Sequence, residues 1–284
     1  MIKYNQIKEI PIEYLNSKIN EYLEEDSPRG DITTEGTISA DSTVVAQLIA
    51  KDNLVLSGRN VLEAIFDENT QINCNFMDGD IVSNRDIIAT ISGNSIEILR
   101  KERIFLNLMQ RMSGIATTTK RYVDIAKPHN VVVLDTRKTT PGLRMFEKYS
   151  VCMGGGQNHR YSLSTGILIK DNHIVAAGGV KEAVLGCKEL DSTLPIQIEV
   201  ATKEQIPNAI ESGADGLLLD NMLPEYLAES VKFAKDIKNN IFLEASGGIT
   251  LENLSGYVTT GIDAVSVGAL THSVKSSDIS LKFI

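Results

Sequence analysis

Six short apolar runs recur in the second half of the chain, and they constrain its fold more than any other feature. The runs are Val131–Leu134, Ile167–Ile169, Ile196–Ile198, Gly216–Leu219, Ile241–Leu243 and Ala264–Val267. Nearly continuous apolar runs of this length are typical of strands that are buried on both faces of a parallel sheet. Helical stretches separate the later runs, at residues 203–213, 224–240 and 250–261. Strands that alternate with helices predict βαβ units and an α/β fold.

Polar or glycine residues follow every one of these runs. They are Asp135 to Lys138, Lys170 to His173, Glu199, Asp220-Asn221, Glu244 to Gly248, and Gly268-Ala269. In an α/β barrel the carboxyl ends of the strands share one rim, where active sites are built. An open doubly wound sheet also collects ligands at its strand ends. We favour the barrel because all six ends carry such residues. Six strands do not support a closed eight-stranded barrel, so the prediction is an incomplete α/β barrel.

The first part of the chain has a different pattern of apolar and polar residues. Residues 1–26 predict a helix followed by a turn, and residues 40–95 predict strands around a short helix at 59–68. Residues 95–127 predict a long helix that Gly114 can end. We therefore expect an N-terminal α+β domain at residues 1–110, with the tail 272–284 packing on it, and a barrel domain at residues 111–271.

Composition excludes several classes of protein. The 284 residues are 42% hydrophobic, which is ample for a core, and the net charge of −9 argues against nucleic acid as the main partner. No apolar run reaches the roughly 18 residues of a membrane span, and the N-terminus lacks the apolar segment of a secretory signal. The three cysteines have no metal-ligand spacing. We expect a cytoplasmic protein without a membrane partner.

Residues 135–173 concentrate positive charge in this acidic chain. The stretch contains six cations, three anions, the triple glycine Gly154–Gly156 and two histidines, His159 and His173. The cations are Arg137, Lys138, Arg144, Lys148, Arg160 and Lys170. Arginine forks and lysine charges suit carboxylates and phosphates, and glycine lets the backbone approach a ligand. The pattern favours a small-anion site over a solvated basic loop, and either histidine could be an acid or an anion ligand there.

Two further features of the strand ends favour phosphate chemistry. Glu199 and Asp220 end neighbouring strands, and Mg²⁺ usually takes one or two carboxylates together with substrate phosphates. Helix capping or an ion pair with Lys138 or Lys170 is the alternative for these carboxylates. The glycine-containing turns at residues 246–248 and 268–269 follow the last two strands, where barrels often hold a phosphate. Ordinary tight turns are the alternative there.

Several motifs resemble the quinolinate phosphoribosyltransferase family. They are TRKTTPGLR, EKYSV, GGGQNHR and LIKDNH, and the likeness continues through RGDITT, ERIFLNLMQRMSGIAT, IEV, LLLDN, EASGGI and VSVGALTHSVKSSDISLK. The resemblance implies an N-terminal α/β sandwich domain, an incomplete α/β barrel and assembly into a homodimer or a larger oligomer with shared active sites. It also implies the Mg²⁺-dependent reaction of quinolinate with phosphoribosyl pyrophosphate in de novo NAD biosynthesis. The products are nicotinate mononucleotide, pyrophosphate and CO₂.

The resemblance also implies roles for single residues. Lys138, Lys170, Glu199 and Asp220 would be catalytic, and Glu199 and Asp220 would serve the ribose and the metal, partly through water and substrate. The ligands of quinolinate or pyrophosphate would be Thr136, Arg137, Lys138, His159, Arg160 and Lys170. The cradle of the 5′-phosphate would be Ser246, Gly247, Gly248, Val267, Gly268 and Ala269. Arg103 would reach the active site of the neighbouring subunit.

Two alternatives to the quinolinate enzyme stay open at this point. A homologous family associated with molybdate transport shares TRK and HR but usually lacks the lysine of IKDNH, so Lys170 favours the quinolinate enzyme. Ser162 and Thr165 stand where Gly and Asp are commoner in the family. The second alternative is a non-catalytic sensor of phosphorylated metabolites, which would not need the whole set of cations and carboxylates.

Overall fold

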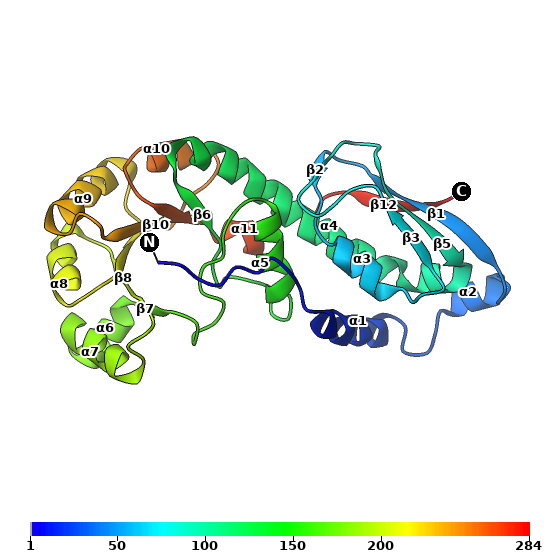
Figure 1. The fold of residues 1–284 in the computed structure, drawn as a ribbon, viewed down its shortest axis with the longest axis horizontal. Helices are drawn as coiled ribbons and strands as arrows, with labels where there is room; N and C mark the ends of the chain where they lie inside the picture. The colour runs from blue at the N-terminus through cyan, green and yellow to red at the C-terminus, as the bar shows by residue number, and fades with distance from the viewer. Residues whose placement is uncertain (1) are drawn as a thin grey trace. The chain divides into compact units, whose positions relative to one another are not determined.

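The computed structural model describes residues 2–284, which divide into two compact units (Figure 1). The barrel unit comprises the N-terminal residues through Gln6, Arg121–Thr140 and Gly156–His272. The sandwich unit comprises Ile7–Lys120, Pro141–Gly155 and Ser273–Ile284. This division differs from the expected boundary between residues 110 and 111. The long helix α4 (Ser95–Ala126) runs through that point, and residues 141–155 return to the sandwich unit.

The barrel unit is built on a six-stranded parallel sheet. Its strands are β6 (Val132–Leu134), β7 (Ile167–Ile169), β8 (Ile196–Val200), β9 (Gly216–Asp220), β10 (Phe242–Ser246) and β11 (Ala264–Ser266). Their order is β6-β11-β10-β9-β8-β7, so the first strand lies beside the last, and β6 and β7 do not pair with each other. The sheet therefore wraps round without closing, which confirms the predicted α/β fold with an incomplete barrel.

Short helices follow the strands and lie around the outside of the sheet (Figure 1). They are α6 (Asp171–Ala177), α7 (Val180–Leu190), α8 (Ile206–Glu211), α9 (Pro224–Ile237), α10 (Leu254–Val258) and α11 (Ala269–His272), with 3₁₀ turns at Lys127–His129 and Lys203–Gln205. The three expected helices are present with shorter bounds. The sequence did not indicate α6, because none of its residues is buried and it has no apolar stripe to detect.

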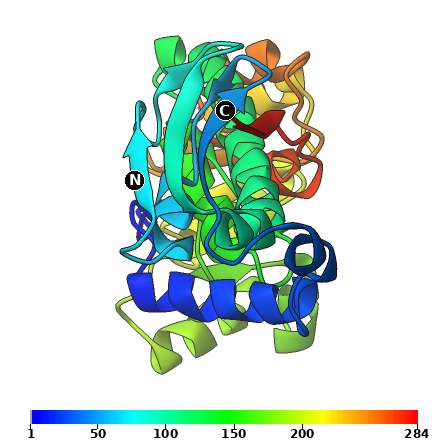
Figure 2. The ribbon, with the colours of Figure 1, turned by 90° about the vertical axis from the view of Figure 1, so that its right-hand side faces the viewer.

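The sandwich unit has an antiparallel sheet in the order β12-β1-β5-β3 and a two-stranded sheet β2-β4. The strands are β1 (Thr43–Ala50), β2 (Leu54–Val55), β3 (Gln71–Cys74), β4 (Ile81–Val82), β5 (Ile87–Asn94) and β12 (Ile279–Phe283). The remaining helices are α1 (Ile12–Asp26), α2 (Ile32–Thr37), α3 (Arg59–Ile65) and α5 (Arg144–Met153). In the tail, β12 pairs with β1, so the C-terminus lies at this sheet (Figure 2).

Two glycines of the sandwich unit act in packing. Gly114 does not end α4, because the helix continues to Ala126. A β-carbon on Gly114 would collide with the carbonyl oxygen of Lys275, so the glycine lets the tail cross the helix closely. A β-carbon on Gly154 would likewise collide with the carbonyl oxygen of Ala116. Gly154 therefore brings the end of α5 against α4, and it does not bring backbone towards a ligand.

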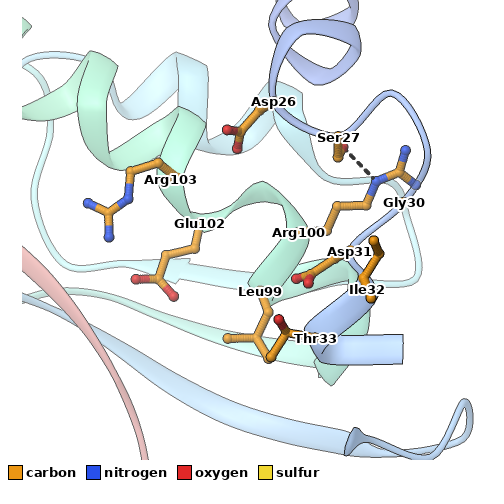
Figure 3. A pocket seen from close by; sticks show the side chains of 10 residues that line it. All are labelled: Asp26, Ser27, Gly30, Asp31, Ile32, Thr33, Leu99, Arg100, Glu102 and Arg103. Carbon is orange, nitrogen blue, oxygen red and sulfur yellow. Dashed lines mark hydrogen bonds between the residues drawn. The ribbon is translucent and has the colours of Figure 1, made fainter. Parts of the chain in front are cut away.

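Arg103 lies on α4 in a hollow of about 430 Å³ on the sandwich unit (Figure 3). We call this the Arg103 hollow; its lining is Asp26, Ser27, Gly30, Asp31, Ile32, Thr33, Leu99, Arg100, Glu102 and Arg103. Arg100 donates from Nε to the hydroxyl of Ser27 at 3.0 Å, whereas Arg103 is exposed and its side chain forms no hydrogen bond or ion pair with residues 2–284.

No helix within residues 2–284 combines the length and apolarity that crossing a bilayer requires.

Candidate active site

A pocket of about 490 Å³ opens at the carboxyl ends of the barrel strands, and we call it the rim pocket. Its lining is Thr136, Arg137, Lys138, His159, Arg160, Leu168, Lys170, Glu199, Leu218, Asp220, Asn221, Glu244, Ser246, Gly247, Gly248 and Ser266. Four of these side chains are cations and three are carboxylates. Eleven residues that the sequence analysis selected from six separate segments thus meet around one space, as expected for ligands at strand ends.

The strand register explains which side chains reach this pocket. Glu199 on β8 lies opposite Leu218 on β9, which lies opposite Glu244 on β10. Two residues further along, Asp220 lies opposite Ser246. Side chains two apart on a strand point to the same face, so these positions form two successive rows on the inner face. In the row nearer the floor of the pocket, Leu218 therefore lies between the carboxylates of Glu199 and Glu244.

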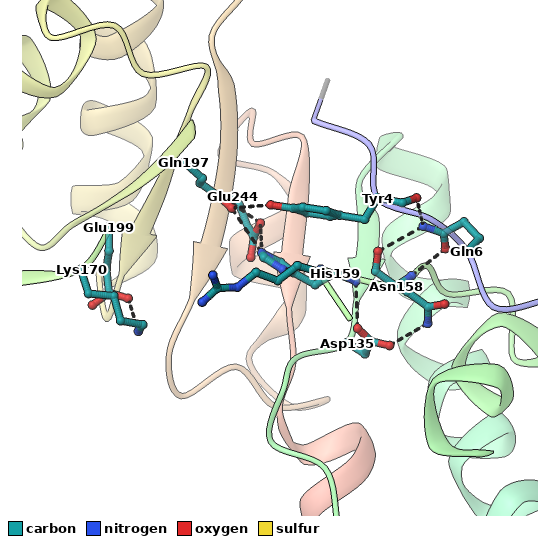
Figure 4. Close-up of polar contacts among 10 residues, drawn as sticks. Tyr4, Gln6, Asp135, Asn158, His159, Lys170, Gln197, Glu199 and Glu244 are labelled. Carbon is teal, nitrogen blue, oxygen red and sulfur yellow. Dashed lines mark hydrogen bonds and ion pairs between the residues drawn. The ribbon is translucent and has the colours of Figure 1, made fainter. Parts of the chain in front are cut away.

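Asp135 anchors the segment that carries His159 and Arg160 (Figure 4). Its side chain is fully buried and accepts from the Nδ2 of Asn158 at 2.7 Å and from the backbone N–H of His159 at 2.8 Å. Gln157 extends the same segment along β6 by exchanging backbone hydrogen bonds with Val133 and Asp135. The two basic residues are consequently held beside the end of β6, next to the opening in the barrel.

His159 is engaged at both ring nitrogens and on one face of its ring. Its Nδ1 accepts from the backbone N–H of Arg160 at 2.7 Å, and its Nε2 lies 3.2 Å from Oε1 of Gln197. The ring of Tyr4 stacks on it with 4.6 Å between centroids (Figure 4). This is the arrangement of a neutral imidazole with its proton on Nε2. His159 thus suits a fixed polar wall better than a general acid.

Two guanidinium groups are held in the wall of the pocket, and neither pairs with a carboxylate among the residues that the structure describes. Arg160 is buried and donates from NH1 to the carbonyl of Gly166 at 2.9 Å. Its burial and the nearby charge of Arg137 lower the pKa of Arg160 from its usual value. The Nε of Arg137 is also buried and has no hydrogen-bond partner among residues 2–284. Arginine stays charged in proteins, so this pair creates a site for an anion.

Glu199 and Asp220 are both at the rim, and each already has a neighbour. Lys170 donates from Nζ to Oε2 of Glu199 at 2.6 Å, which is the ion pair considered as an alternative, and Asn221 donates from Nδ2 to Oδ2 of Asp220 at 2.6 Å. Residues 2–284 contain no cluster of three or more His, Cys, Asp or Glu side chains placed to hold a metal. Two carboxylates fit Mg²⁺ only in its usual mode, in which substrate phosphates and water complete the coordination.

The turns after β10 and β11 need their glycines. Gly247 has a φ of 95°, and a β-carbon there would collide with Asn221, whose backbone N–H donates to the carbonyl of Ser246 at 2.8 Å. A β-carbon on Gly268 would lie 3.0 Å from Cδ of Lys138, so this glycine leaves room for the lysine stem. Val267, Gly268 and Ala269 stand beside the pocket but do not line it, whereas Ser266 does.

The sequence and the fold both match known proteins. Profiles described as the N-terminal and C-terminal domains of quinolinate phosphoribosyl transferase match residues 31–113 and 115–282. The chain is 42% identical over 271 residues to a probable nicotinate-nucleotide pyrophosphorylase [carboxylating] of Bacillus subtilis, covering 94% of this chain and 92% of that protein. It belongs to the quinolinate phosphoribosyltransferase family.

Other members of the family agree. The chloroplastic nicotinate-nucleotide pyrophosphorylase [carboxylating] of Arabidopsis thaliana is 39% identical over 272 residues, covering 89% of this chain and 78% of that one. The structure of the nicotinate-nucleotide pyrophosphorylase from Francisella tularensis superposes with a TM-score of 0.94 at 35% identity, covering 99% of this chain and 100% of that one. The N-terminal α+β sandwich domain and the incomplete barrel are thus the family's fold, as predicted.

Three residues of the basic stretch 135–173 that were candidates for the anion site do not line the rim pocket of this phosphoribosyltransferase. Arg144 and Lys148 lie on α5 in the sandwich unit, where Lys148 is fully buried. His173 lies at the start of α6, and its Nδ1 accepts from the backbone N–H of Lys170 at 3.0 Å, so it caps the helix. Arg144 and Lys148 lie away from the pocket because residues 141–155 belong to the sandwich unit. No local sequence pattern indicates that this segment leaves the barrel unit.

Sequence reasoning also assigned no role to Glu244, which lines the pocket, or to Gln197 and Tyr4, which contact the lining residues Glu244 and His159. Glu244 and Gln197 are fully buried, and Tyr4 comes from the N-terminal segment. The alternation of polar and apolar residues in IQIEV and FLEAS would have placed Gln197 with Glu199, and Glu244 with Ser246, on one face. Nothing in the sequence connects Tyr4 with His159, because the contact joins segments about 150 residues apart.

Proposed function

We propose that this chain transfers the phosphoribosyl group of phosphoribosyl pyrophosphate to quinolinate with loss of CO₂. The products are nicotinate mononucleotide, pyrophosphate and CO₂, which is a step of de novo NAD biosynthesis. The observation that carries the proposal is the rim pocket, in which two guanidinium groups without a carboxylate partner among residues 2–284 and two lysines meet carboxylates and glycine turns at strand ends. Relatives at 36–42% identity bear the name of this activity.

The wall formed by Arg137 and Arg160 suits quinolinate. Two adjacent carboxylates on an aromatic ring match two arginine forks, which bind carboxylates through paired hydrogen bonds. Leu168 and Leu218 supply apolar surface for the ring. Lys138 adds a compact charge from the end of β6. In this assignment, Thr136 and the fixed ring of His159 border the same space.

The opposite side of the pocket suits the ribose and its phosphates. Glu199 and Asp220 would accept hydrogen bonds from the ribose hydroxyls, and Lys170 would meet the pyrophosphate. The turns at residues 246–248 and 267–269 would hold the 5′-phosphate through backbone N–H groups. Glu199 and Asp220 would also hold Mg²⁺, partly through water and substrate. The ion would neutralise charge on the departing pyrophosphate.

The chemistry needs no covalent nucleophile. Ribosyl transfer passes through an oxocarbenium-like state, so positioning and stabilisation of the leaving group lower its barrier. The lysines and arginines of the pocket supply that stabilisation. Once ribosylated, the pyridine nitrogen is cationic and can stabilise the carbanion that loss of CO₂ leaves at C2. The chain then has mainly to bind and orient the ring.

The charge balance of the pocket favours further positive groups from outside it. Its four cations exceed its three carboxylates by one, whereas quinolinate is a dianion and its co-substrate carries several phosphates. A metal ion and an arginine from another subunit would make up the difference. We assign the arginine to Arg103, which is exposed and has no side-chain hydrogen bond or ion pair among residues 2–284, in a homodimer that shares its active sites. We expect the enzyme in the cytoplasm, although the Arabidopsis relative is named chloroplastic.

The direct test incubates the protein with quinolinate, phosphoribosyl pyrophosphate and Mg²⁺ and measures nicotinate mononucleotide and CO₂. Both products should appear, and omission of Mg²⁺ should suppress them. Nicotinate has one carboxylate and would leave a buried arginine unpaired, which costs roughly 1–3 kcal/mol, so it should react poorly. Equal turnover of nicotinate would contradict the assignment of the arginine wall. Binding of phosphoribosyl pyrophosphate without any product would favour a sensor.

A further inference from the structure

Glu244 places a carboxyl group at the floor of the rim pocket, and one of its two oxygens accepts no hydrogen bond from residues 2–284. The residue is fully buried on β10, and its side chain lines the pocket. Oε2 accepts from Nε2 of Gln197 at 2.9 Å and lies 3.6 Å from Nε2 of His159 (Figure 4). Oε1 has no hydrogen-bond partner among residues 2–284. An ionised carboxylate can accept about four hydrogen bonds, so this one is mostly unsatisfied.

The charge of Glu244 is also uncompensated by the chain. No lysine or arginine among residues 2–284 forms an ion pair with it, and His159 is held as a neutral ring by the hydrogen bond at Nδ1. Burying an unpaired carboxylate is unfavourable, and such groups persist mainly where a ligand completes them. Glu244 is one of the lining residues of the rim pocket, so a ligand bound there would lie beside its carboxylate.

We propose that Glu244 stabilises the positive charge that develops during ribosyl transfer. The inference rests on the proposed function. In that reaction the lone pair of the pyridine nitrogen forms the bond to the anomeric carbon, and the bond to the pyrophosphate oxygen breaks with its electron pair. Positive charge appears on the sugar and then remains on the ring nitrogen, while no proton is transferred. A carboxylate fixed in a water-poor site stabilises that charge strongly.

This role has a distinctive kinetic signature. Both substrates are anionic, so the carboxylate of Glu244 does not help them to bind, and it acts only when cationic character appears. Glu244→Gln keeps the shape and removes the charge. It should lower kcat on the order of 100-fold, with the KM for quinolinate unchanged or lower. A residue that only supported the fold would instead change stability and KM.

The decisive measurement is the binding of two matched ligands, 1-methylpyridinium-3-carboxylate and 3-methylbenzoate. They have the same shape and carboxylate, and differ in a cationic ring nitrogen against a ring carbon. Calorimetry in metal-free buffer excludes any contribution of Mg²⁺. The wild-type protein should prefer the pyridinium, and Glu244→Gln should reduce that preference by about tenfold. An equal affinity of the wild type for both ligands would overturn the proposal, whatever the variants do.

Two controls separate charge from support. Gln197→Met removes the hydrogen bond to Oε2 but leaves the carboxylate, so it should keep the pyridinium preference. Loss of the preference in Gln197→Met, with no loss in Glu244→Gln, would show that the site acts through shape and would refute the charge role. Glu244→Asp keeps the charge and should retain part of the preference if Glu244→Gln does not fold. Absence of quinolinate turnover in the wild type would refute the proposed function. The comparison of the two ligands could still be interpreted, because it measures binding and not turnover.

Discussion

The two units each bury a glutamate, and they treat it in opposite ways. In the sandwich unit, Glu147 is 1% exposed and Arg111 donates to its Oε1 from Nε at 2.9 Å and from NH2 at 2.6 Å. In the barrel unit, Glu244 is fully buried and has one amide donor, and its other oxygen has no hydrogen-bond partner in the described part of the chain. Satisfied buried charges hold a fold together, whereas unsatisfied ones beside a pocket indicate a function.

The comparison extends to the other charged groups of the two units. The barrel unit arranges Arg137, Arg160 and Glu244 around one space, and the chain itself leaves them incompletely paired. The sandwich unit encloses its buried glutamate with an arginine between α4 and α5. We therefore expect charge substitutions to lower turnover in the barrel unit and stability in the sandwich unit. Arg103 is the exception that would break this division.

The largest expected effect is the loss of a rim lysine. Lys138→Ala or Lys170→Ala should lower kcat/KM by about 1,000-fold, because each side chain would meet the pyrophosphate or the acceptor directly. Their free energies of unfolding should stay close to that of the wild type, since both residues are exposed. Lys→Arg should restore only part of the activity. Lys232→Ala on α9, also exposed, is the matched control, and full activity in Lys170→Ala would remove that residue from the mechanism.

Arg103→Ala tests whether a residue of the sandwich unit can govern turnover. The variant should fold, dimerise and lose about 100-fold or more in kcat/KM. When it is mixed with Lys138→Ala, random pairing makes about half the dimers mixed, each with one intact site. Roughly a quarter of the wild-type activity should then return. If confirmed subunit exchange brings no recovery, Arg103 acts within its own chain or has no catalytic role.

A smaller effect is expected from Glu199→Gln and Asp220→Asn. Both changes are nearly isosteric and remove only charge, so the concentrations of Mg²⁺ and phosphoribosyl pyrophosphate for half-maximal rate should rise by about tenfold. The KM for quinolinate should change little. Initial rates across a matrix of metal and co-substrate concentrations measure this. Normal kinetics together with a large loss of stability would assign these two carboxylates to the structure instead.

Glu147→Gln should behave in the reverse manner. Breaking its ion pair with the partly exposed Arg111 should lower the free energy of unfolding by about 2 kcal/mol. Turnover should stay within about twofold of the wild type. Chemical denaturation of this variant, of Arg111→Ala and of the double variant gives the coupling between the two side chains. A strong fall in kcat with unchanged stability would erase the contrast with Glu244.

The smallest effect is expected at Tyr4. Burial and the charge of Glu244 raise the pKa of its hydroxyl, so the group stays protonated throughout the working range. Tyr4→Phe keeps the ring that stacks on His159 and removes only a hydroxyl 3.5 Å from Gln197. Activity should stay within about twofold, and the pH profiles from about pH 6 to 10 should coincide. A profile that changes with this substitution would mean that the hydroxyl takes part in proton transfer.

The barrel and most of its rim were predictable, because buried parallel strands leave continuous apolar runs and ligands follow them. Glu199 and Asp220 were located by that rule alone. The state of Glu244 was not predictable, since it depends on Gln197 and His159, which come from other segments. The places of Arg144 and Lys148 were also hidden, because nothing in residues 141–155 indicates that this segment joins the other unit.

The interleaving of the two units has a consequence for synthesis. The chain passes from the barrel unit to the sandwich unit and back, and β12, which pairs with β1, is translated after all of the barrel unit. The segment with Tyr4, translated first, packs on His159, translated much later. The sandwich unit therefore cannot be completed until the whole barrel unit has been translated, unlike a domain that folds before the next one is made. Contacts so distant in sequence also slow folding, so newly made chains would expose unpaired strand edges to chaperones.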